Sequence, residues 1–241
     1  MIRIAVLIFI ATIQYQAVAQ FSEVEPENPL PRAGQSVNLL ITLDKKDLSI
    51  LERKHELTGE ESNTLRSNRV GRGSLKITEV FKDTGDVVIG PFTFVIGGET
   101  YTTNSIKLNV RAPLPDDARE GLWVSTLRLD NQYFVVVEQR IPNSIKRDSK
   151  DPNTIAINDS DANFAELDTD KLYDRGLELI SSSESTDNQF LGKDTNTGVV
   201  TYKVTVYKFR ALKNFGGSLK IDRSFFIKLP KTSWIEEAIL R

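Results

Sequence analysis

Residues 122–139 read LWVSTLRLDNQYFVVVEQ, and this stretch decides the class of the fold. Its two halves, 122–129 and 132–139, are rich in β-branched, aromatic and aliphatic side chains, and the polar step Asp130-Asn131 separates them. Apolar runs that are bounded by turn residues are typical of paired β-strands. The continuous run Val135-Val136-Val137 indicates a strand whose centre is buried. We therefore expect two joined strands here, the second of them in a core.

The rest of the chain repeats this strand-and-turn pattern. Residues 87–96 supply two strand segments, with Gly90-Pro91 as the break between them. Gly97-Gly98 is a two-residue hairpin signal, because glycine tolerates positive φ. From Leu75 to Lys82 apolar and polar side chains alternate imperfectly, which favours a half-buried strand. The other expected strands are 37–43, 105–110, 177–180, 199–211, 218–221 and 224–229.

Four segments do not read as strands. Residues 47–57 have the apolar spacing of a short helix but serve equally well as a connection. Residues 143–174 are polar, contain seven Asp residues and predict the longest surface excursion. Residues 111–121 hold two prolines and several charges, which is typical of a linker. Residues 234–241 are expected to form one or two terminal helical turns.

Composition bounds the class of protein. The chain has 241 residues, 39% of them hydrophobic and 27% charged, which is typical of a globular protein. Its 31 basic and 33 acidic residues are interspersed, so no electrostatic footprint for nucleic acid is present. There is no Cys, which removes thiol nucleophiles and thiolate zinc sites.

The N-terminus has the pattern of a secretory signal. Arg3 precedes the apolar run 4–13, and Ala17-Val18-Ala19 forms an Ala-x-Ala cleavage site before Gln20. Ten apolar residues fall short of the roughly 20 that span a bilayer. We therefore expect export, with no transmembrane segment in the mature chain.

The two halves of the chain repeat the same order of sequence segments. Residues 55–64 resemble residues 177–186, and each is followed by an alternating strand, a turn with Gly and a short strand. Two immunoglobulin-like β-sandwiches of roughly 100 residues each fit the length. The expected organisation is an all-β fold with a signal peptide (1–19), a first sandwich (20–112), a linker (113–121), a second sandwich (122–232) and a C-terminal tail (233–241).

Two segments of the first half resemble a known family. Residues 85–92 read GDVVIGPF and residues 97–110 read GGETYTTNSIKLNV. This strand, Pro-aromatic step, hairpin and closing strand resemble the end of the first module in the oxygen-tolerance family typified by BatD, the Bacteroides aerotolerance protein. The Ser-rich stretch 181–186 also resembles a strand of that family. Glu99 stands where the family often has Lys, and typical members are longer and carry a transmembrane segment toward the C-terminus.

The resemblance implies tandem immunoglobulin-like domains in the periplasm. It also implies association with membrane-anchored von Willebrand factor A domain proteins and a functional link to a MoxR-type ATPase.

Few residues suggest chemistry. His55, the only histidine, lies between Lys54 and Glu56 and is expected to be an ordinary strand or loop residue rather than a triad base. No Gly-x-Ser-x-Gly elbow or phosphate-binding glycine motif is present, and Gly71-Arg72-Gly73 and Gly216-Gly217 read as turns.

The Asp-rich excursion contains a partial calcium pattern. Asp159, Asp161 and Asn163 alternate, and Asp170 falls at the twelfth position, but Phe164 occupies the place that needs Gly. A solvated acidic loop is therefore expected over 148–174, with a looser cation site left open.

Aromatic residues on the expected strands allow two interpretations. Core packing is favoured, whereas an exposed platform would indicate carbohydrate binding. The residues are Trp123, Tyr133, Phe134, Tyr202, Tyr207 and Phe209.

The sequence thus favours an exported, non-catalytic interaction or assembly module of the bacterial envelope. Its mature chain is expected to be soluble in the periplasm or held at a membrane only through partner proteins. No catalytic, cofactor-binding or metal-binding residue is expected. The alternative is a periplasmic or surface carbohydrate-binding β-sandwich.

Overall fold

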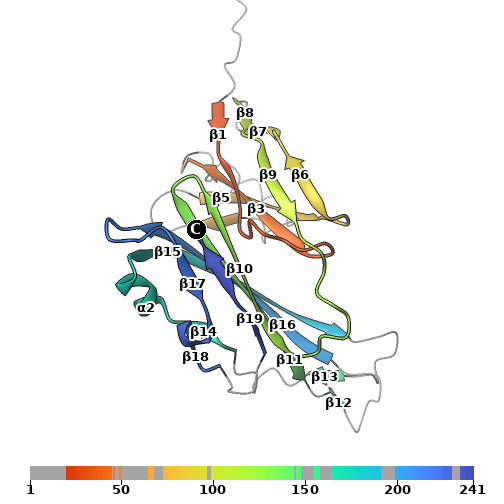
Figure 1. Cartoon of the computed structure of the whole chain (residues 1–241). Helices are drawn as coiled ribbons and strands as arrows, with labels where there is room; N and C mark the ends of the chain where they lie inside the picture. Colours follow the sequence, from red (N-terminus) through yellow and green to blue (C-terminus); the bar gives the residue numbers. More distant parts are fainter. Residues whose placement is uncertain are drawn as a thin grey trace, which may run out of the picture. The chain divides into compact units, whose positions relative to one another are not determined.

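The structure is a computed structural model that describes residues 20–44, 46, 49, 65–67, 73–96, 99–143, 145–147, 155–157, 164–190, 199–229 and 234–241 (Figure 1). The described chain is all-β, as expected, and holds only short helical pieces such as α2 (Thr169–Asp174) and the 3-10 turn η3 (Arg223–Phe225). None of the helices in these ranges has the length and apolarity to cross a membrane. The expected signal peptide, residues 1–19, lies outside the described residues.

The chain divides into two compact units. The first takes its described residues from 1–25, 40–76 and 89–106, and the second from 26–39, 77–88 and 107–241. The expected boundary at 113–121 and the immunoglobulin-like topology of each half stay predictions.

The first unit contains a three-stranded sheet of order β1-β8-β7. Strand β1 (Gln20–Ser22) pairs in parallel with β8 (Glu99–Thr103), and β7 (Thr93–Ile96) pairs antiparallel with β8. Ile96 lies opposite Glu99, which is the strand pairing that the hairpin signal predicted, although Gly97 and Gly98 themselves lie outside the described residues.

The break between the two strand segments of 87–96 is confirmed. Strand β6 (Gly85–Ile89) ends at Gly90, whose φ is +79° and whose peptide bond to Pro91 is cis. A Cβ on Gly90 would lie 2.9 Å from the carbonyl oxygen of Asn104, so only glycine fits this position.

The remaining strands of the first half of the chain form a sheet of order β2-β3-β5-β4 and a pair β6-β9. Their bounds are β2 (Val24–Pro26), β3 (Ser36–Leu43), β4 (Leu65–Ser67), β5 (Gly73–Val80) and β9 (Ile106–Val110).

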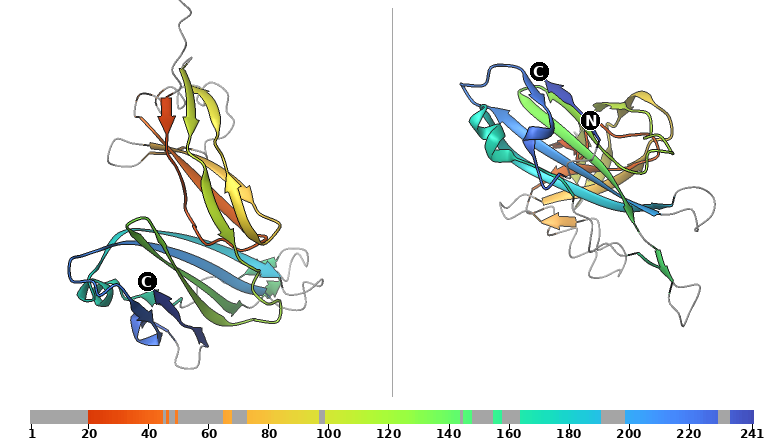
Figure 2. Two further views of the ribbon diagram at one scale, coloured as in Figure 1. Left: turned by 45° about the horizontal axis from the view of Figure 1, so that its top comes forward. Right: turned by 60° about the horizontal axis from the view of Figure 1, so that its bottom comes forward.

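The second unit is built on a five-stranded sheet of order β15-β16-β11-β10-β19, which can be followed in Figure 1 and Figure 2. The strands β10 (Gly121–Leu129), β11 (Gln132–Asn143), β16 (Val199–Ala211) and β15 (Leu177–Phe190) pair antiparallel, and β19 (Ile235–Glu236) pairs in parallel with β10. Val135, Val136 and Val137 are buried at the centre of β11. The expectation of a buried second strand is therefore confirmed.

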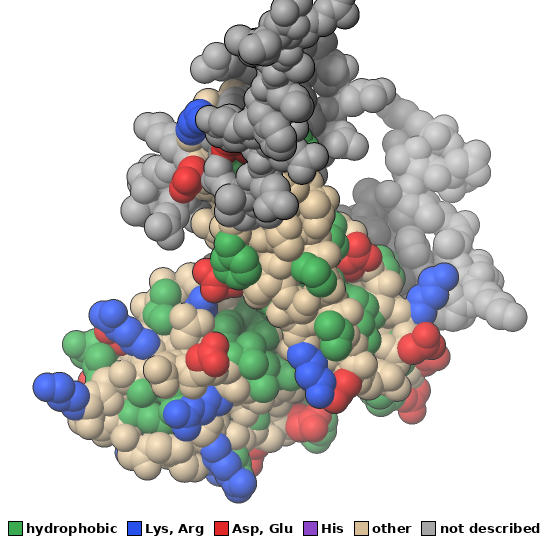
Figure 3. All heavy atoms as spheres, turned by 90° about the horizontal axis from the view of Figure 1, so that it is seen from above, with side chains coloured by type: hydrophobic (Ala, Val, Ile, Leu, Met, Phe, Trp, Pro, Cys, Tyr) green, Lys and Arg blue, Asp and Glu red, His purple; other side chains and the backbone are tan. Residues whose placement is uncertain are grey.

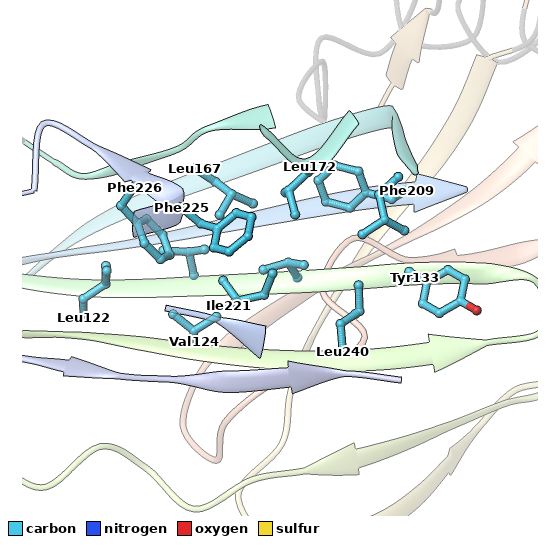
Figure 4. Close-up of a cluster of buried hydrophobic side chains, with 13 residues drawn as sticks. Leu122, Val124, Tyr133, Leu167, Leu172, Phe209, Ile221, Phe225, Phe226 and Leu240 are labelled. Atoms are coloured by element: carbon cyan, nitrogen blue, oxygen red, sulfur yellow. The ribbon is translucent and has the colours of Figure 1, made fainter. Parts of the chain in front are cut away.

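Each face of this sheet carries its own core. On one face Val135, Val137 and Phe209 pack with residues of α2, η3 and four short strands (Figure 4). On the other face Phe134, Val136 and Val204 pack with Leu30 and Leu114. Because both faces are covered, β11 reads as a continuous apolar run. The short strands are β14 (Glu166–Leu167), β17 (Leu219–Ile221), β18 (Phe226–Ile227) and β20 (Ala238–Leu240), paired as β14-β18 and β17-β20.

Three sequence expectations differ from the structure. The terminal segment 234–241 is not helical, because β19 pairs with β10 and Leu240 of β20 is buried in the core. The expected strand 177–180 continues to Phe190. The excursion 143–174 contains regular structure, namely the pair β12 (Ile145–Arg147) and β13 (Ile155–Ile157), then β14 and α2.

Candidate functional site

The candidate site is the edge of the five-stranded sheet formed by β15. This strand is 14 residues long and pairs only with β16 among the described strands. In an antiparallel edge strand every second residue directs its N–H and C=O away from the sheet. The opposite edge, β19, has only two residues. β15 therefore offers the long edge of this sheet.

A bulge divides β15 into two parts with different faces. The pairing shifts between Leu179 and Ser181, so Ile180 has no partner on β16. Before the bulge Leu177 lies opposite Ala211 and is buried in the core that holds Phe209. After it, Ser183, Ser185 and Asp187 lie opposite Val206, Val204 and Tyr202, respectively. Opposed residues share a face of the sheet, so the bulge places these three polar side chains, here called the polar stripe, on the face of Val204 and Val206.

A groove of about 340 Å³ lies along this stripe, within the second unit. Val204 and Val206 contribute apolar surface to it, together with the ring of Tyr202. Val37 also lines it, and the other lining residues are polar or small: Glu27, Asn28, Gly34, Gln35, Ser36, Asn38, Ser183, Glu184, Ser185, Thr186, Asp187 and Gln189. The groove thus runs beside the polypeptide edge and combines hydroxyl, amide and carboxylate groups.

Charge in the groove is of one sign. Two carboxylates line it, on Glu27 and Asp187, and its described lining includes no Lys or Arg. Glu184 also borders the groove, but it lies opposite Thr205 and its side chain is on the other face of the sheet. Glu184 is paired with Lys203 at 2.7 Å, and Glu27 accepts a hydrogen bond from Asn38 Nδ2 at 2.7 Å. By contrast, acidic and basic side chains are intermixed over the face of the molecule drawn in Figure 3.

One end of the groove rests on a buried ionic cluster, here called the Glu138 cluster, of Arg32, Gln35, Arg111, Glu138 and Tyr202. The Glu138 side chain is fully buried, and Arg32 Nε donates to its two oxygens at 2.8 and 3.0 Å. Arg111 Nη2 donates to Oε2 at 2.8 Å, and the Tyr202 hydroxyl donates to Oε1 at 2.5 Å. Gln35 Nε2 donates to the Tyr202 oxygen. Gln35 Nε2 also donates to Oε1 of Glu138 at 3.5 Å. The carboxylate therefore accepts five hydrogen bonds, and a buried charge requires such partners.

The cluster also fixes backbone on this face of the sheet. Arg32 Nη1 donates to the carbonyl of Ala112 at 2.8 Å, and Arg111 donates to the carbonyl of Leu30 at 2.6 and 3.0 Å. The two extended segments that contain these residues are thereby tied to β11 and β16. One of the segments continues into the groove wall at Gly34–Asn38.

The pKa values in the cluster follow from burial and charge. Burial alone would raise the pKa of Glu138, but the hydrogen bond from Arg32 and the charges of Arg111 and Arg32 hold it below its ordinary value. Burial, with the Glu138 carboxylate beside it, raises the pKa of the Tyr202 phenol. Burial also lowers the pKa of Arg111. Glu138 is therefore an anion and Tyr202 a neutral donor in this cluster.

Arg140 adds a third cation on this face, besides Arg32 and Arg111. It is 8% exposed, its Nη1 donates to the carbonyls of Pro115 and Ala118 at 2.8 and 3.0 Å, and its guanidinium lies 5.8 Å from the ring centre of Tyr202. Its Nε has no hydrogen-bond partner among the described residues. Arg140 therefore packs against the aromatic ring that borders the groove.

The aromatic residues singled out in the sequence are core residues, as favoured. Trp123, Tyr133, Phe134, Tyr202 and Phe209 are buried, and Tyr207 is half-buried and packs against the core of Phe209. They are divided between the two faces of the sheet and form no exposed platform.

The remaining sequence candidates do not converge on a site. Asp170 lies in the first turn of α2, and Phe164 is half-buried, with its ring 5.4 Å from Lys203 Nζ. In the described ranges no group of three or more His, Cys, Asp or Glu side chains is arranged to hold a metal ion. Gly217 has φ +78°, as its turn assignment requires. His55, Asp159, Asp161, Asn163 and Gly71-Arg72 lie outside the described residues.

Comparison with known proteins adds no relative. No protein-family model matches the chain, and no curated protein and no solved structure matches it.

Proposed function

We propose that this chain is a non-catalytic interaction module of the bacterial envelope that binds partner proteins through the edge of β15. The proposal includes two tandem immunoglobulin-like domains, export by the N-terminal signal, and membership of the BatD-like oxygen-tolerance family. Membrane proteins with von Willebrand factor A domains are the proposed partners.

The observation that carries the proposal is the length and openness of the β15 edge. Sheets commonly protect such an edge with Lys or Pro, with bulges, or by keeping it short. β15 has 14 residues, and the sequence LELISSSESTDNQF contains no Lys, Arg or Pro. Its only irregularity is the bulge at Leu179/Ser181, which leaves ten consecutive residues in regular register with β16. Ten residues extend about 33 Å, which is enough for a partner strand of ordinary length.

The character of the groove supports binding over catalysis. Its described lining contains neither a histidine nor a cysteine, and the carboxylate of Glu138, which lies beside it, accepts five hydrogen bonds. Strand addition needs no reactive group, because backbone hydrogen bonds supply affinity and alternate side chains supply selectivity.

The test is affinity capture of the tagged mature protein, Gln20 to Arg241, from solubilised native envelopes, with mass spectrometry of the retained proteins. Two edge variants, Ser185→Pro and Thr186→Pro, accompany the wild type. Neighbouring residues of a strand direct their N–H groups to opposite sides, so one of the two prolines removes an outward N–H and the other removes a ladder bond to β16. Thermal unfolding identifies the variant that keeps its fold.

We expect the wild type to retain von Willebrand factor A domain membrane proteins and the folded proline variant to lose them. Equal retention by the folded variant would remove β15 as the binding edge. Retention of no protein, together with binding of the wild type to a glycan array, would replace the proposal with the carbohydrate-binding alternative.

A further inference from the structure

We infer that the β15 edge and its groove bind an extended polypeptide segment that is basic. This inference rests on the proposed function and deepens it, because it names the chemical class of the segment that β15 accepts. The shape of the edge alone would admit any unpaired strand. The charges around it restrict the choice.

The edge strand itself is acidic. Within Leu177–Phe190 the charged residues are Glu178, Glu184 and Asp187, and none is basic. Lys on an edge strand would repel basic segments, whereas carboxylates repel acidic ones. Glu178 and Glu184 are already engaged across the strand pair, with Arg210 at 2.6 Å and Lys203 at 2.7 Å. Asp187, at the end of β15 that lies along the groove, is exposed and is the carboxylate best placed to meet a partner.

The groove continues the same sign of charge on the face where a partner's side chains would lie. Ser183, Ser185, Asp187 and Gln189 follow one another on this face at the two-residue period of a strand. A strand added at the free edge would present every second side chain beside this stripe. Glu27 and Asn38 form part of the groove lining, so Glu27 is a second carboxylate, besides Asp187, in the groove that a Lys or Arg side chain would enter.

The same charges disfavour a second copy of this chain as the occupant. Two β15 strands paired with each other would bring carboxylates together across the new interface, and neither β15 strand carries a basic residue to offset them. The acidic edge thus acts against self-pairing while it leaves the strand open to a basic partner.

The test uses three ten-residue peptides and isothermal titration calorimetry with the full mature chain. In the first peptide Lys alternates with Val and Thr. In the second, Glu replaces Lys. The third keeps every Lys of the first and replaces alternate residues with Pro, so that charge is retained while backbone donors are lost.

The protein variants are Asp187→Asn, Asp187→Lys and a matched control, Asp174→Lys. Asp174 is the last residue of α2, is exposed, and belongs to an element that packs against the opposite face of the sheet through Leu172. The control therefore makes the same change in net charge away from the groove.

We expect the Lys peptide to bind, the Glu peptide to bind at least tenfold more weakly, and the Pro peptide to lose binding. Asp187→Asn is expected to weaken binding about threefold and Asp187→Lys about tenfold, with Asp174→Lys unchanged. Raising the salt concentration should weaken binding of the Lys peptide, because the carboxylates are exposed.

Equal binding of the Lys and Glu peptides, or equal losses in Asp187→Lys and Asp174→Lys, would overturn the inference. Equal binding of the Lys and Pro peptides would overturn strand pairing as its basis. If the peptides fail while the folded proline variant still loses envelope partners, the basic class of partner is wrong and the proposed function stands. If the proline variant also retains its partners, the proposed function fails as well.

Discussion

Replacement of Glu138 by Gln is the perturbation that most sharply tests the architecture beneath the groove. The substitution keeps the size of the side chain and removes its charge, which leaves the guanidinium groups of Arg32 and Arg111 without their shared anion. Both guanidinium groups are largely buried, with side chains 13% and 17% exposed, and the Glu138 side chain is fully buried. Loss of one partner from a buried ion pair costs about 3–5 kcal/mol. This is a large part of the roughly 5–15 kcal/mol by which a domain is stable.

The assay is equilibrium unfolding in urea, followed by tryptophan fluorescence. The chain has two tryptophans, and both Trp123 and Trp234 belong to the second unit. Trp123 is buried and lies opposite Glu138 in the β10-β11 register, so it reports on the surroundings of the cluster. With a urea dependence of about 2 kcal/mol per molar, a loss of about 4 kcal/mol lowers the midpoint by about 2 M.

The matched control is Asp86→Asn. Asp86 pairs with Lys107 at 2.8 Å, but the two side chains are 55% and 67% exposed, so this change should lower the urea midpoint far less than Glu138→Gln does. A Glu138→Gln midpoint within experimental error of Asp86→Asn would refute the reasoning, because the buried cluster would then contribute no more than a surface pair.

Three further predictions follow from the same structure. The pKa of Glu138 is lowered in the folded state, so its contribution to stability is present above the unfolded pKa of about 4.3 and is lost as pH falls through the folded pKa. The urea midpoint of the wild type should therefore drop more between pH 5 and pH 3 than the midpoint of Glu138→Gln. Equal drops of the two midpoints would contradict this. Gly176 has φ +87°, and a Cβ there would lie 2.7 Å from the backbone nitrogen of Phe215, so Gly176→Ala should lower the free energy of unfolding in urea by about 1–3 kcal/mol. Gly217→Ala is the control and should cost less, because Gly217 has φ +78° but nothing lies within 4 Å of the added Cβ. Leu172 is fully buried in the core beneath α2, so Leu172→Ala should cost about 2–5 kcal/mol in the same assay, and a cost below about 1 kcal/mol would mean that α2 is not docked there.

The sequence predicts the centre of the second unit well. The hairpin β10-β11 and the buried Val135-Val136-Val137 follow from a long apolar run with one polar turn, a strong signal that needs no tertiary information. The break at Gly90-Pro91 was equally visible, because Pro and Gly act locally.

The edge strand and the terminal strands were not predictable to their full extent. After the bulge, one face of β15 lines a polar groove and the other is largely exposed, so Ser181 to Gln189 show no hydrophobic alternation. Pairing with β16 makes this segment a strand, which is a tertiary effect rather than a local preference. β19 and β20 have two and three residues, too few for a periodic pattern to appear.

The Glu138 cluster was hidden for a different reason. Arg32 and Arg111 are 106 and 27 residues away from Glu138 in the chain, and neither spacing marks a pair. The available signal was Glu138 itself, a carboxylate directly after a run expected to be buried, because a charge in such a place requires a cationic partner.

The most direct test of the central claim, that partners bind at β15, is site-specific photo-crosslinking. Because the chain has no cysteine, Ser185→Cys and Asp174→Cys each provide a single attachment point for a photoreactive group, one on the edge strand and one on α2. After illumination in native envelopes, we expect a covalent partner from the Ser185→Cys protein and none from the Asp174→Cys protein. Cross-links of equal yield from the two positions, or from α2 alone, would contradict the account.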